Sequence, residues 1–178
     1  MTRYGRVEPL AGGDDVAAFD CGSEALTTWL RRHALQAHQS DTAKVYVVCR
    51  NDSRTVVGYY ALAAGAVRRE EAPTRVVKGV GRHPIPVVIL TRLGVDVSEQ
   101  GRGLGSALVR DALFQTASIA ERLGVRALLI HAETPEAAAF YRRIDPGFEA
   151  SPTDPLHLIL LMKDLRGAIE EAATKAPV

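Results

Sequence analysis

The sequence predicts a single mixed α/β (α+β) domain in which helices flank a central β-sheet. Three observations lead to this prediction. The chain has 178 residues, of which 47% are hydrophobic, and this is enough for one buried core. Its apolar segments alternate between the spacing of a helix and that of a strand. A near-continuous apolar run over residues 85–97 is typical of a strand buried on both faces.

The first half of the chain predicts one helix and one hairpin. Residues 23–38 place apolar side chains at helical spacing after Ser23, which is a suitable N-cap. Residues 44–49 and 55–67 are rich in β-branched and aromatic side chains, and the polar link between them indicates a hairpin turn. Residues 68–84 are charged and contain glycine and proline, so they predict a loop.

The second half begins with the buried strand and continues through two helix–strand pairs. A glycine-rich turn leads into a long helix whose apolar side chains, Leu123 included, face one side. A strand over residues 125–132 and a helix opened by Pro135 come next. Alternation over residues 157–165 predicts a last strand, and residues 166–175 predict a terminal helix.

Composition sets the class of protein. The domain is expected to span residues 1–165, with residues 166–178 as a C-terminal helix or tail. No window is apolar over the ~20 residues that a membrane helix needs, and the first residues do not form a signal peptide. Two cysteines are too few for a disulfide framework or a metal cluster. A cytoplasmic protein without a metal or a membrane partner is expected, and its net charge of +1 argues against general coating of nucleic acid.

Three glycines at alternate positions, Gly101, Gly103 and Gly105, stand between the buried strand and the long helix. Such a turn is a general anion site, because the first N–H groups of a helix lack partners within the helix. The dinucleotide fingerprint Gly-x-Gly-x-x-Gly fits badly, since Ser106 occupies the third glycine position. The P-loop also fits badly, since no Gly-Lys pair followed by Ser or Thr is present after the strand.

A third pattern, Gln/Arg-x-x-Gly-x-Gly/Ala, is filled by Gln100, Gly103 and Gly105. With this pattern the sequence resembles the GCN5-related N-acetyltransferases (the GNAT family), whose glycine loop binds the diphosphate of acetyl-CoA. The resemblance implies the GNAT fold, with a central mixed sheet flanked by helices, and acetyl-CoA as the co-substrate. It also implies that the backbone of the preceding strand pairs with the pantetheine arm. The cofactor-binding residues expected in this half are Leu93, Gly94, Val95, Gln100, Gly101, Arg102, Gly103, Leu104, Gly105 and Ser106.

A second family motif, Asn-x-x-Ala-x-x-Phe-Tyr, has its counterpart around Tyr141. Thr134 replaces the usual asparagine, and the gap between Tyr141 and Gly147 is longer because Asp145 and Pro146 are inserted. The resemblance implies that Thr134 and Phe140 contact the cofactor. A phenol with a pKa near 10 can protonate a departing thiolate, so Tyr141 is the expected catalytic residue, with packing beneath the cofactor as the alternative.

No general base is evident from the sequence. His131 and Glu133 end the strand before Tyr141, and structural roles suit both of them better. An α-amine has a pKa near 7.7–8.0, so water is sufficient to accept its proton.

Longer stretches look like the toxin branch of the family (TacT-like), which acetylates the amino group of aminoacyl-tRNA and blocks translation. That resemblance implies a homodimer and a ribbon-helix-helix antitoxin as partners. The alternatives are an N-acetyltransferase of a polyamine, an amino acid or an antibiotic, and a non-catalytic acyl-CoA-binding regulator.

Binding the phosphate backbone of tRNA requires basic side chains. The candidates are Arg31, Arg32, Arg68, Arg69, Arg75, Lys78, Arg82 and Arg92.

Overall fold

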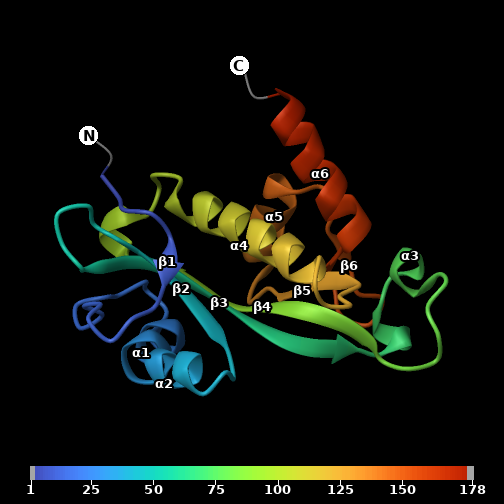
Figure 1. Cartoon of the computed structure of the whole chain (residues 1–178), viewed down its shortest axis with the longest axis horizontal. Helices are drawn as coiled ribbons and strands as arrows, with labels where there is room; N and C mark the ends of the chain where they lie inside the picture. The colour runs from blue at the N-terminus through green and yellow to red at the C-terminus, as the bar shows by residue number, and fades with distance from the viewer. Residues whose placement is uncertain (1–2, 176–178) are drawn as a thin grey trace. The chain divides into compact units, whose positions relative to one another are not determined.

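The computed structural model describes residues 3–175 and contains one sheet, six α-helices and two 3-10 helices (Figure 1). The strands are β1 (Glu8–Pro9), β2 (Lys44–Cys49), β3 (Val56–Val67), β4 (Ile85–Val95), β5 (Ala127–His131), β6 (Glu149–Ala150) and β7 (His157–Leu161). The helices are α1 (Glu24–Arg32), α2 (Ala34–Gln39), α3 (Thr74–Val77), α4 (Leu104–Ala120), α5 (Pro135–Ile144) and α6 (Met162–Lys175). The 3-10 helices are η1 (Arg69–Glu71) and η2 (Val97–Glu99).

The seven strands follow the order β1-β2-β3-β4-β5-β7-β6. The pairs β1–β2, β2–β3, β5–β7 and β6–β7 are antiparallel, whereas β4 and β5 are parallel. The predicted mixed sheet is therefore confirmed, and so is the predicted hairpin, in which Lys44 lies opposite Leu62. The chain divides into two compact units, each of which takes part of β3 and part of β4.

The first unit comprises residues 3–63 and 91–111. Ser23 caps α1 by accepting a hydrogen bond from the Leu26 amide, as predicted. The expected single helix is split, because the backbone leaves helical geometry at His33 (φ −123°) before α2 begins. Tyr59 is fully buried among these elements, with Phe19 at its edge (5.6 Å between ring centroids) and Trp29 stacked on it (6.0 Å).

Helix α4 approaches the sheet closely at Gly58, a residue of β3. A Cβ atom at Gly58 would lie 2.9 Å from Leu108 Cδ1 and 3.0 Å from Val48 Cγ1. Real Cβ atoms essentially never approach other atoms within 3.0 Å, so a side chain at this position would force Leu108 to shift. The start of α4, and with it the glycine turn before the helix, is thereby fixed on the first unit.

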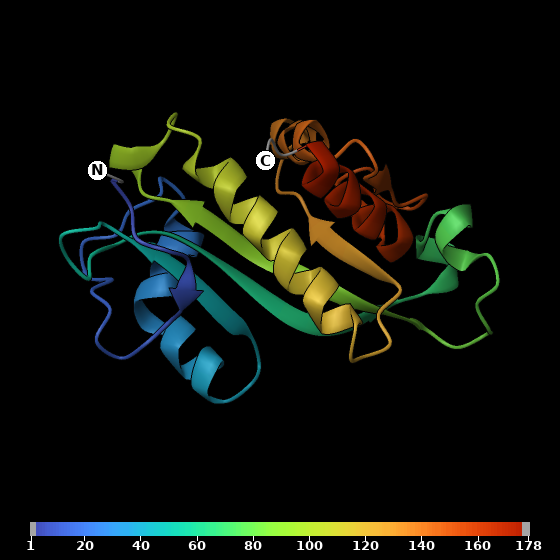
Figure 2. The same cartoon turned by 45° about the horizontal axis from the view of Figure 1, so that its top comes forward.

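The second unit comprises residues 64–90 and 112–175. On one face of the sheet, alternate residues of β5 and β7, such as Leu129 and Ile159, pack with Val76 of α3. On the other face, a Cβ at Gly147 would lie 3.0 Å from Leu160 Cδ1. Figures 1 and 2 show α5 and α6 close together beside β5. The helix that contains Tyr141 thus belongs to this unit.

Besides the split first helix, three further elements differ from the prediction. The predicted loop over residues 68–84 contains η1 and α3. Leu123 is 60% exposed, because α4 ends at Ala120 and the helical spacing no longer applies. The last strand ends at Leu161 rather than at residue 165, and α6 begins at once, with the Met162 amide donating to Arg126 O (3.0 Å).

The predicted domain boundary after residue 165 falls inside α6, and residues 176–178 of the predicted tail lie outside the described residues. Within residues 3–175, no helix has both the length and the apolar character required to cross a membrane.

Candidate active site

The glycine turn in the first unit connects η2 to α4. Gly101 and Gly103 have φ angles of +74° and +83°, which glycine adopts without the strain that a side chain would bring. Both are exposed, whereas Leu104 is buried and anchors the first turn of α4. The first hydrogen bond of the helix runs from the Ala107 amide to Gly103 O (3.1 Å). The amides before Ala107 therefore have no acceptor within the helix and can bind an anion.

Gln100 holds the base of this turn. Its Nε2 donates to Cys21 O (3.0 Å) and to Val95 O (2.9 Å). Both partners belong to the first unit, and Val95 is the last residue of β4. Gln100 therefore holds the shape of the turn, because its amide nitrogen donates to two backbone carbonyls.

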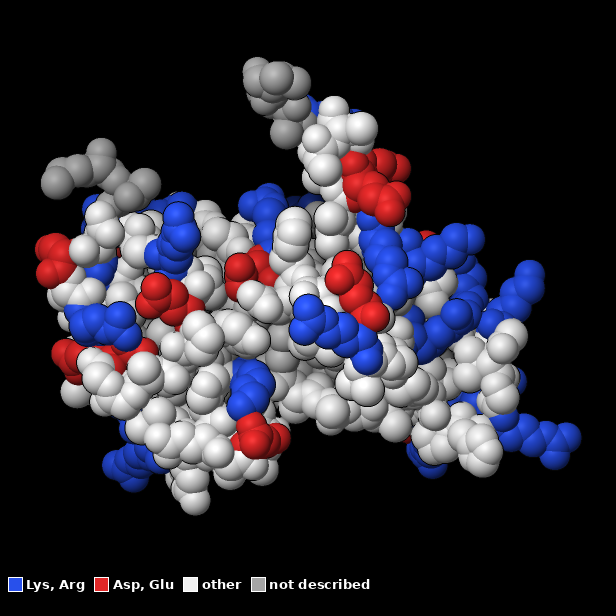
Figure 3. Space-filling model, in the orientation of Figure 1, with Lys and Arg blue, Asp and Glu red and all other residues white. Residues whose placement is uncertain are grey.

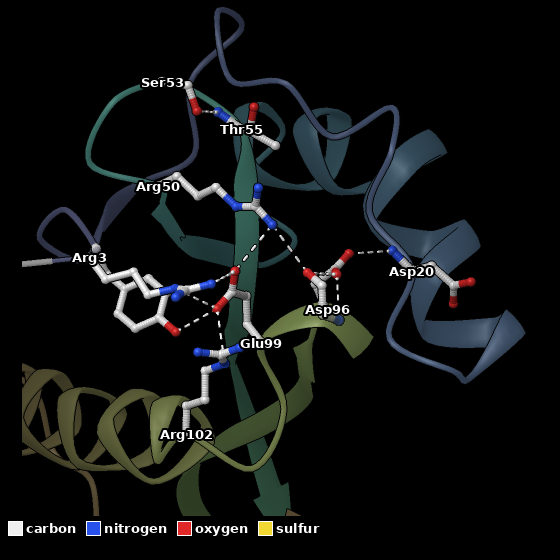
Figure 4. Close-up of polar contacts among 10 residues, drawn as sticks. Arg3, Asp20, Arg50, Ser53, Thr55, Asp96, Glu99 and Arg102 are labelled. Carbon is white, nitrogen blue, oxygen red and sulfur yellow. Dashed lines mark hydrogen bonds and ion pairs between the residues drawn. The ribbon is translucent and has the colours of Figure 1, made fainter.

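A second brace of the turn is Glu99, whose side chain is fully buried (Figure 4). It accepts hydrogen bonds from Tyr4 Oη (2.7 Å), Arg3 Nε (3.0 Å) and Arg3 Nη2 (3.2 Å). Arg50 Nη2 lies 3.1 Å from the carboxylate and Arg102 Nε 3.6 Å from it. The hydrogen bonds from Tyr4 and Arg3 are the main reason that the pKa of the Glu99 carboxyl is lowered.

The strand before the turn carries Leu93, Gly94 and Val95. The pairing of β4 with β5 covers Val87–Leu90, and β4 then continues to Val95 within the first unit. A Cβ at Gly94 would lie 2.9 Å from Tyr59 Cε1, so packing against the aromatic cluster alone requires glycine at this position. This stretch is where the resemblance predicts backbone pairing with the pantetheine arm.

A separate candidate residue, Tyr141, lies on α5 in the second unit. The helix begins as predicted, with Pro135 in its first turn and Thr134 Oγ1 accepting from the Ala137 amide (3.1 Å). Thr134 therefore serves as the N-cap of this helix. Tyr141 is 8% exposed, and its ring contacts Phe140 (5.3 Å between centroids) and Phe148 (6.4 Å).

The Tyr141 hydroxyl is unpaired but reaches the surface. Tyr141 Oη forms no hydrogen bond within the described residues. Every buried side-chain nitrogen or oxygen atom among those residues has a hydrogen-bond partner. Because Tyr141 Oη has no partner, it is not fully buried and contacts solvent. Burial of the residue raises the pKa of Tyr141 to about 12, with a further contribution from the charge of Glu133. The phenol therefore keeps its proton at neutral pH.

The longer gap after Tyr141 forms a compact turn. Asp145 is 8% exposed and accepts a hydrogen bond from the Gly147 amide through Oδ1 (2.8 Å). The Phe148 amide then lies 3.4 Å from Asp145 O. Phe148 still reaches the Tyr141 ring, so the inserted Asp145–Pro146 pair is absorbed without moving the aromatic contact away.

A pocket of about 190 Å³ in the second unit is lined by residues of β3, β4, β5 and β7, together with Glu71 and Ser151. His131 and His157 both line it, and their rings stack at 4.0 Å between centroids. Burial lowers the pKa of His131, and His157 lowers it further. Glu71 also lines the pocket and is paired with Arg68 Nη2 at 2.7 Å. The pocket walls are therefore mixed in polarity rather than acidic.

The basic residues predicted to contact tRNA are divided between the units. In the first unit, Arg92 lies over the Trp29 ring (4.6 Å from Cζ to the centroid). In the second unit, Figure 3 shows blue side chains gathered around α3 and its flanking loops. Arg69 Nη1 donates to Val80 O and Gly81 O, at 2.7 Å each. Arg75 donates to both oxygens of Asp164 (2.7 and 2.9 Å).

The remaining basic candidates are exposed and, within residues 3–175, take part in no ion pair. They are Arg31, Arg32, Lys78 and Arg82. These side chains are free to meet a phosphate, whereas Arg68, Arg69 and Arg75 already have carboxylate or carbonyl partners.

A family model described as "Acetyltransferase (GNAT) domain" matches residues 41–149, which is more than half of the chain. The chain belongs to the GNAT acetyltransferase family. The predicted fold and family membership are thereby confirmed. The matched region contains both the glycine turn and Tyr141.

Three relatives carry this comparison further. The chain is 48% identical to a "tRNA-acetylating toxin" of Mycobacterium tuberculosis, over 95% of this chain and 99% of the relative. It is similar to the solved structure of AtaT complexed with acetyl-methionyl-tRNAfMet, with a TM-score of 0.84, 30% identity, and coverage of 92% of this chain and 98% of that chain. It is also similar to an AtaT mutant toxin bound to the C-terminus of the antitoxin AtaR, with a TM-score of 0.78, 28% identity, and coverage of 94% and 98%.

The sequence did not indicate that Arg3, Tyr4, Arg50 and Glu99 shape the glycine turn. Glu99 precedes the glycine pattern directly, and an acidic residue at that place gave no sign that it would be buried. Arg3, Tyr4 and Arg50 lie 49 to 96 positions away from Glu99 in the sequence, so no local pattern connects them to it.

Proposed function

We propose that this chain transfers the acetyl group of acetyl-CoA to the amino group of an aminoacyl-tRNA and thereby blocks translation. The observation that carries the proposal is the 48% identity to a tRNA-acetylating toxin over nearly the whole chain. Membership of the GNAT family supports acetyl-CoA as the donor. The glycine turn and Tyr141 supply the two chemical functions that such a transfer needs.

The donor binds at the glycine turn. Its diphosphate accepts hydrogen bonds from the amides of residues 102–106, where the helix adds a partial positive charge. Exposed backbone at Gly101 and Gly103 lets phosphate oxygens approach closely. The pantetheine arm pairs with the backbone of Leu93–Val95, beyond the stretch of β4 that pairs with β5.

Tyr141 acts as the general acid. The neutral amine attacks the thioester carbonyl carbon, the new C–N bond forms, and the C–S bond then breaks. The sulfur leaves as a thiolate and takes the phenolic proton of Tyr141, while water accepts the proton that the amine loses. The raised pKa of Tyr141 keeps that proton in place until the thiolate forms, and contact with solvent allows its replacement.

The acceptor is recognised through its phosphates. Arg31, Arg32, Lys78 and Arg82 are the side chains proposed to bind the tRNA backbone, since they are exposed and take part in no ion pair within the described residues. A polyamine acceptor would favour an acidic pocket. The pocket beside His131 and His157 does not provide one, because its carboxylate, Glu71, is neutralised by Arg68.

An antitoxin is the proposed partner, supported by the structure of an AtaT mutant toxin bound to the C-terminus of the antitoxin AtaR. We further propose that this antitoxin is of the ribbon-helix-helix class and that the active enzyme is a homodimer, as the resemblance to the toxin branch implies. The proposed location is the cytoplasm, where charged tRNA is available.

The function is tested with radiolabelled acetyl-CoA offered separately to charged tRNA, to uncharged tRNA and to a set of polyamines and amino acids. Label on charged tRNA alone, removed when the aminoacyl ester is hydrolysed, is the expected result. Label on a small amine would establish the small-molecule acetyltransferase instead. Binding of acetyl-CoA without transfer to any acceptor would establish a non-catalytic acyl-CoA-binding regulator.

A further inference from the structure

Arginines from three separate segments meet at the buried Glu99 carboxylate, next to the glycine turn (Figure 4). Arg3 comes from the start of the chain, Arg50 follows β2, and Arg102 lies within the turn itself. All of these residues belong to the first unit. One buried negative charge thus holds three positive charges in a fixed arrangement.

The positive charge of this cluster faces solvent. The Glu99 side chain is 0% exposed, whereas those of Arg3, Arg50 and Arg102 are 55%, 44% and 49% exposed. Each guanidinium has five N–H donors, and Glu99 has only two oxygens, so donors remain on the exposed side. The nearby Asp96 carboxylate is occupied by the Ser98 amide (2.9 Å) and the Asp20 amide (3.0 Å).

We propose that Arg3, Arg50 and Arg102 form a second phosphate site that binds the ribose 3′-phosphate of coenzyme A. This inference rests on the proposed function, because it requires the diphosphate of acetyl-CoA at the neighbouring turn. The coenzyme carries this monoester on the ribose joined to its diphosphate, so a bound diphosphate keeps the monoester within reach. A monoester is nearly doubly charged at neutral pH and suits the forked donors of arginine better than a backbone amide does.

Glu99 is a positioning residue in this arrangement. Its carboxylate fixes the guanidinium groups before the ligand arrives, and it leaves the cluster with more positive than negative charge. The three side chains would otherwise repel one another and lose side-chain entropy on binding.

The experiment compares acetyl-CoA with 3′-dephospho-acetyl-CoA as donors, using calorimetry for affinity and acetylation of charged tRNA for kcat/KM. The unmodified protein should prefer acetyl-CoA by at least about tenfold, since each charge-assisted hydrogen bond to phosphate contributes strongly. Arg50→Gln should reduce this preference to about threefold or less, mainly by weakening the binding of acetyl-CoA itself. Arg3→Gln should do the same, and it keeps the test decisive if the first variant does not fold.

The matched control is Arg54→Gln. Arg54 is as exposed as Arg3, at 55%, and is also ion-paired, but with Asp14 and Glu8. This variant should retain the full preference for acetyl-CoA, which separates recognition of the 3′-phosphate from a general loss of positive charge.

Three outcomes would overturn the inference. Equal kcat/KM for both donors in the unmodified protein would do so while leaving the proposed function intact. An unchanged preference in both Arg50→Gln and Arg3→Gln would assign the cluster a purely structural role. A higher KM for charged tRNA with no change in the donor preference would show that the phosphate bound here belongs to the tRNA backbone. Failure of the unmodified protein to bind either donor would instead remove the proposed function.

Discussion

The glycine turn and the Tyr141 helix provide the two chemical functions of the proposed reaction, and they are built in opposite ways. At the turn, the proposed binding groups are exposed backbone amides, and the amide side chain of Gln100 and the carboxylate of Glu99 hold them from behind. At Tyr141, the functional group is a side chain surrounded by apolar rings, and its hydroxyl has no partner within the described residues. A backbone site therefore depends on its bracing residues, whereas a side-chain site depends on burial of the group itself.

The largest expected effect concerns the hydroxyl of Tyr141. Tyr141→Phe keeps the ring between Phe140 and Phe148 and removes only the proton donor. Turnover should fall by about 10²–10⁴-fold, the usual contribution of a general acid, while affinity for acetyl-CoA stays within about twofold. Single-turnover acetylation and calorimetry measure the two quantities. Phe140→Leu is the control for lost packing, and normal turnover in Tyr141→Phe would leave this tyrosine a packing role only.

The corresponding change at the backbone site is Gly103→Ala. No atom lies within 4 Å of the added Cβ, but the φ of +83° is strained for alanine, so the turn would shift. We expect affinity for acetyl-CoA to fall about tenfold. Gly81→Ala is the matched control, since its Cβ would also meet open space and its φ lies outside the strained range. Equal affinity in the two variants would mean that the turn does not bind the coenzyme.

The hydrogen bonds that the Glu99 carboxylate accepts behind the glycine turn should affect the pH dependence of the protein's stability. The Glu99 pKa is lowered in the folded state, so its contribution is present above the unfolded pKa near 4.5 and is lost as pH falls further. Glu99→Gln should lower the melting temperature at pH 7 by roughly 5 °C and should show a shallower loss of stability between pH 5 and pH 3. Glu121→Gln, at an exposed position, should behave like the unmodified protein. An identical acid profile in both variants would contradict the brace.

The smallest effect is expected at Thr134, which caps the helix of Tyr141. Thr134→Ala should reduce the free energy of unfolding by about 1 kcal/mol through loss of the cap, and Thr134→Ser should restore it. The KM for acetyl-CoA should change less than twofold in either variant. A large rise in KM without a loss of stability would assign Thr134 to cofactor binding, as the family motif implies.

The sequence predicted the parts of the fold that depend on local patterns. The hairpin, the buried strand, the glycine turn and the capped helix at Pro135 all leave signals within a few residues. The end of the last strand was wrong because alternation over residues 157–165 continues into the first turn of α6, and a short apolar run does not distinguish a strand from a helix.

The bracing of the site was not predictable. Arg3 and Arg50 look like ordinary surface arginines in the sequence, and only the folded chain brings them to Glu99. Gln100 fitted the family pattern, but its contacts with Cys21 O and Val95 O depend on where distant backbone lies. Local patterns thus indicate which groups bind a ligand, and long-range contacts decide how firmly those groups are held.

The contacts of Arg3 and Tyr4 with Glu99 have a practical consequence for work with this enzyme. They connect residues 3 and 4 to Glu99, which precedes the glycine turn. A truncation that removes residues 3 and 4 would therefore delete hydrogen bonds that the Glu99 carboxylate accepts, and it would perturb the glycine turn from the opposite end of the sequence.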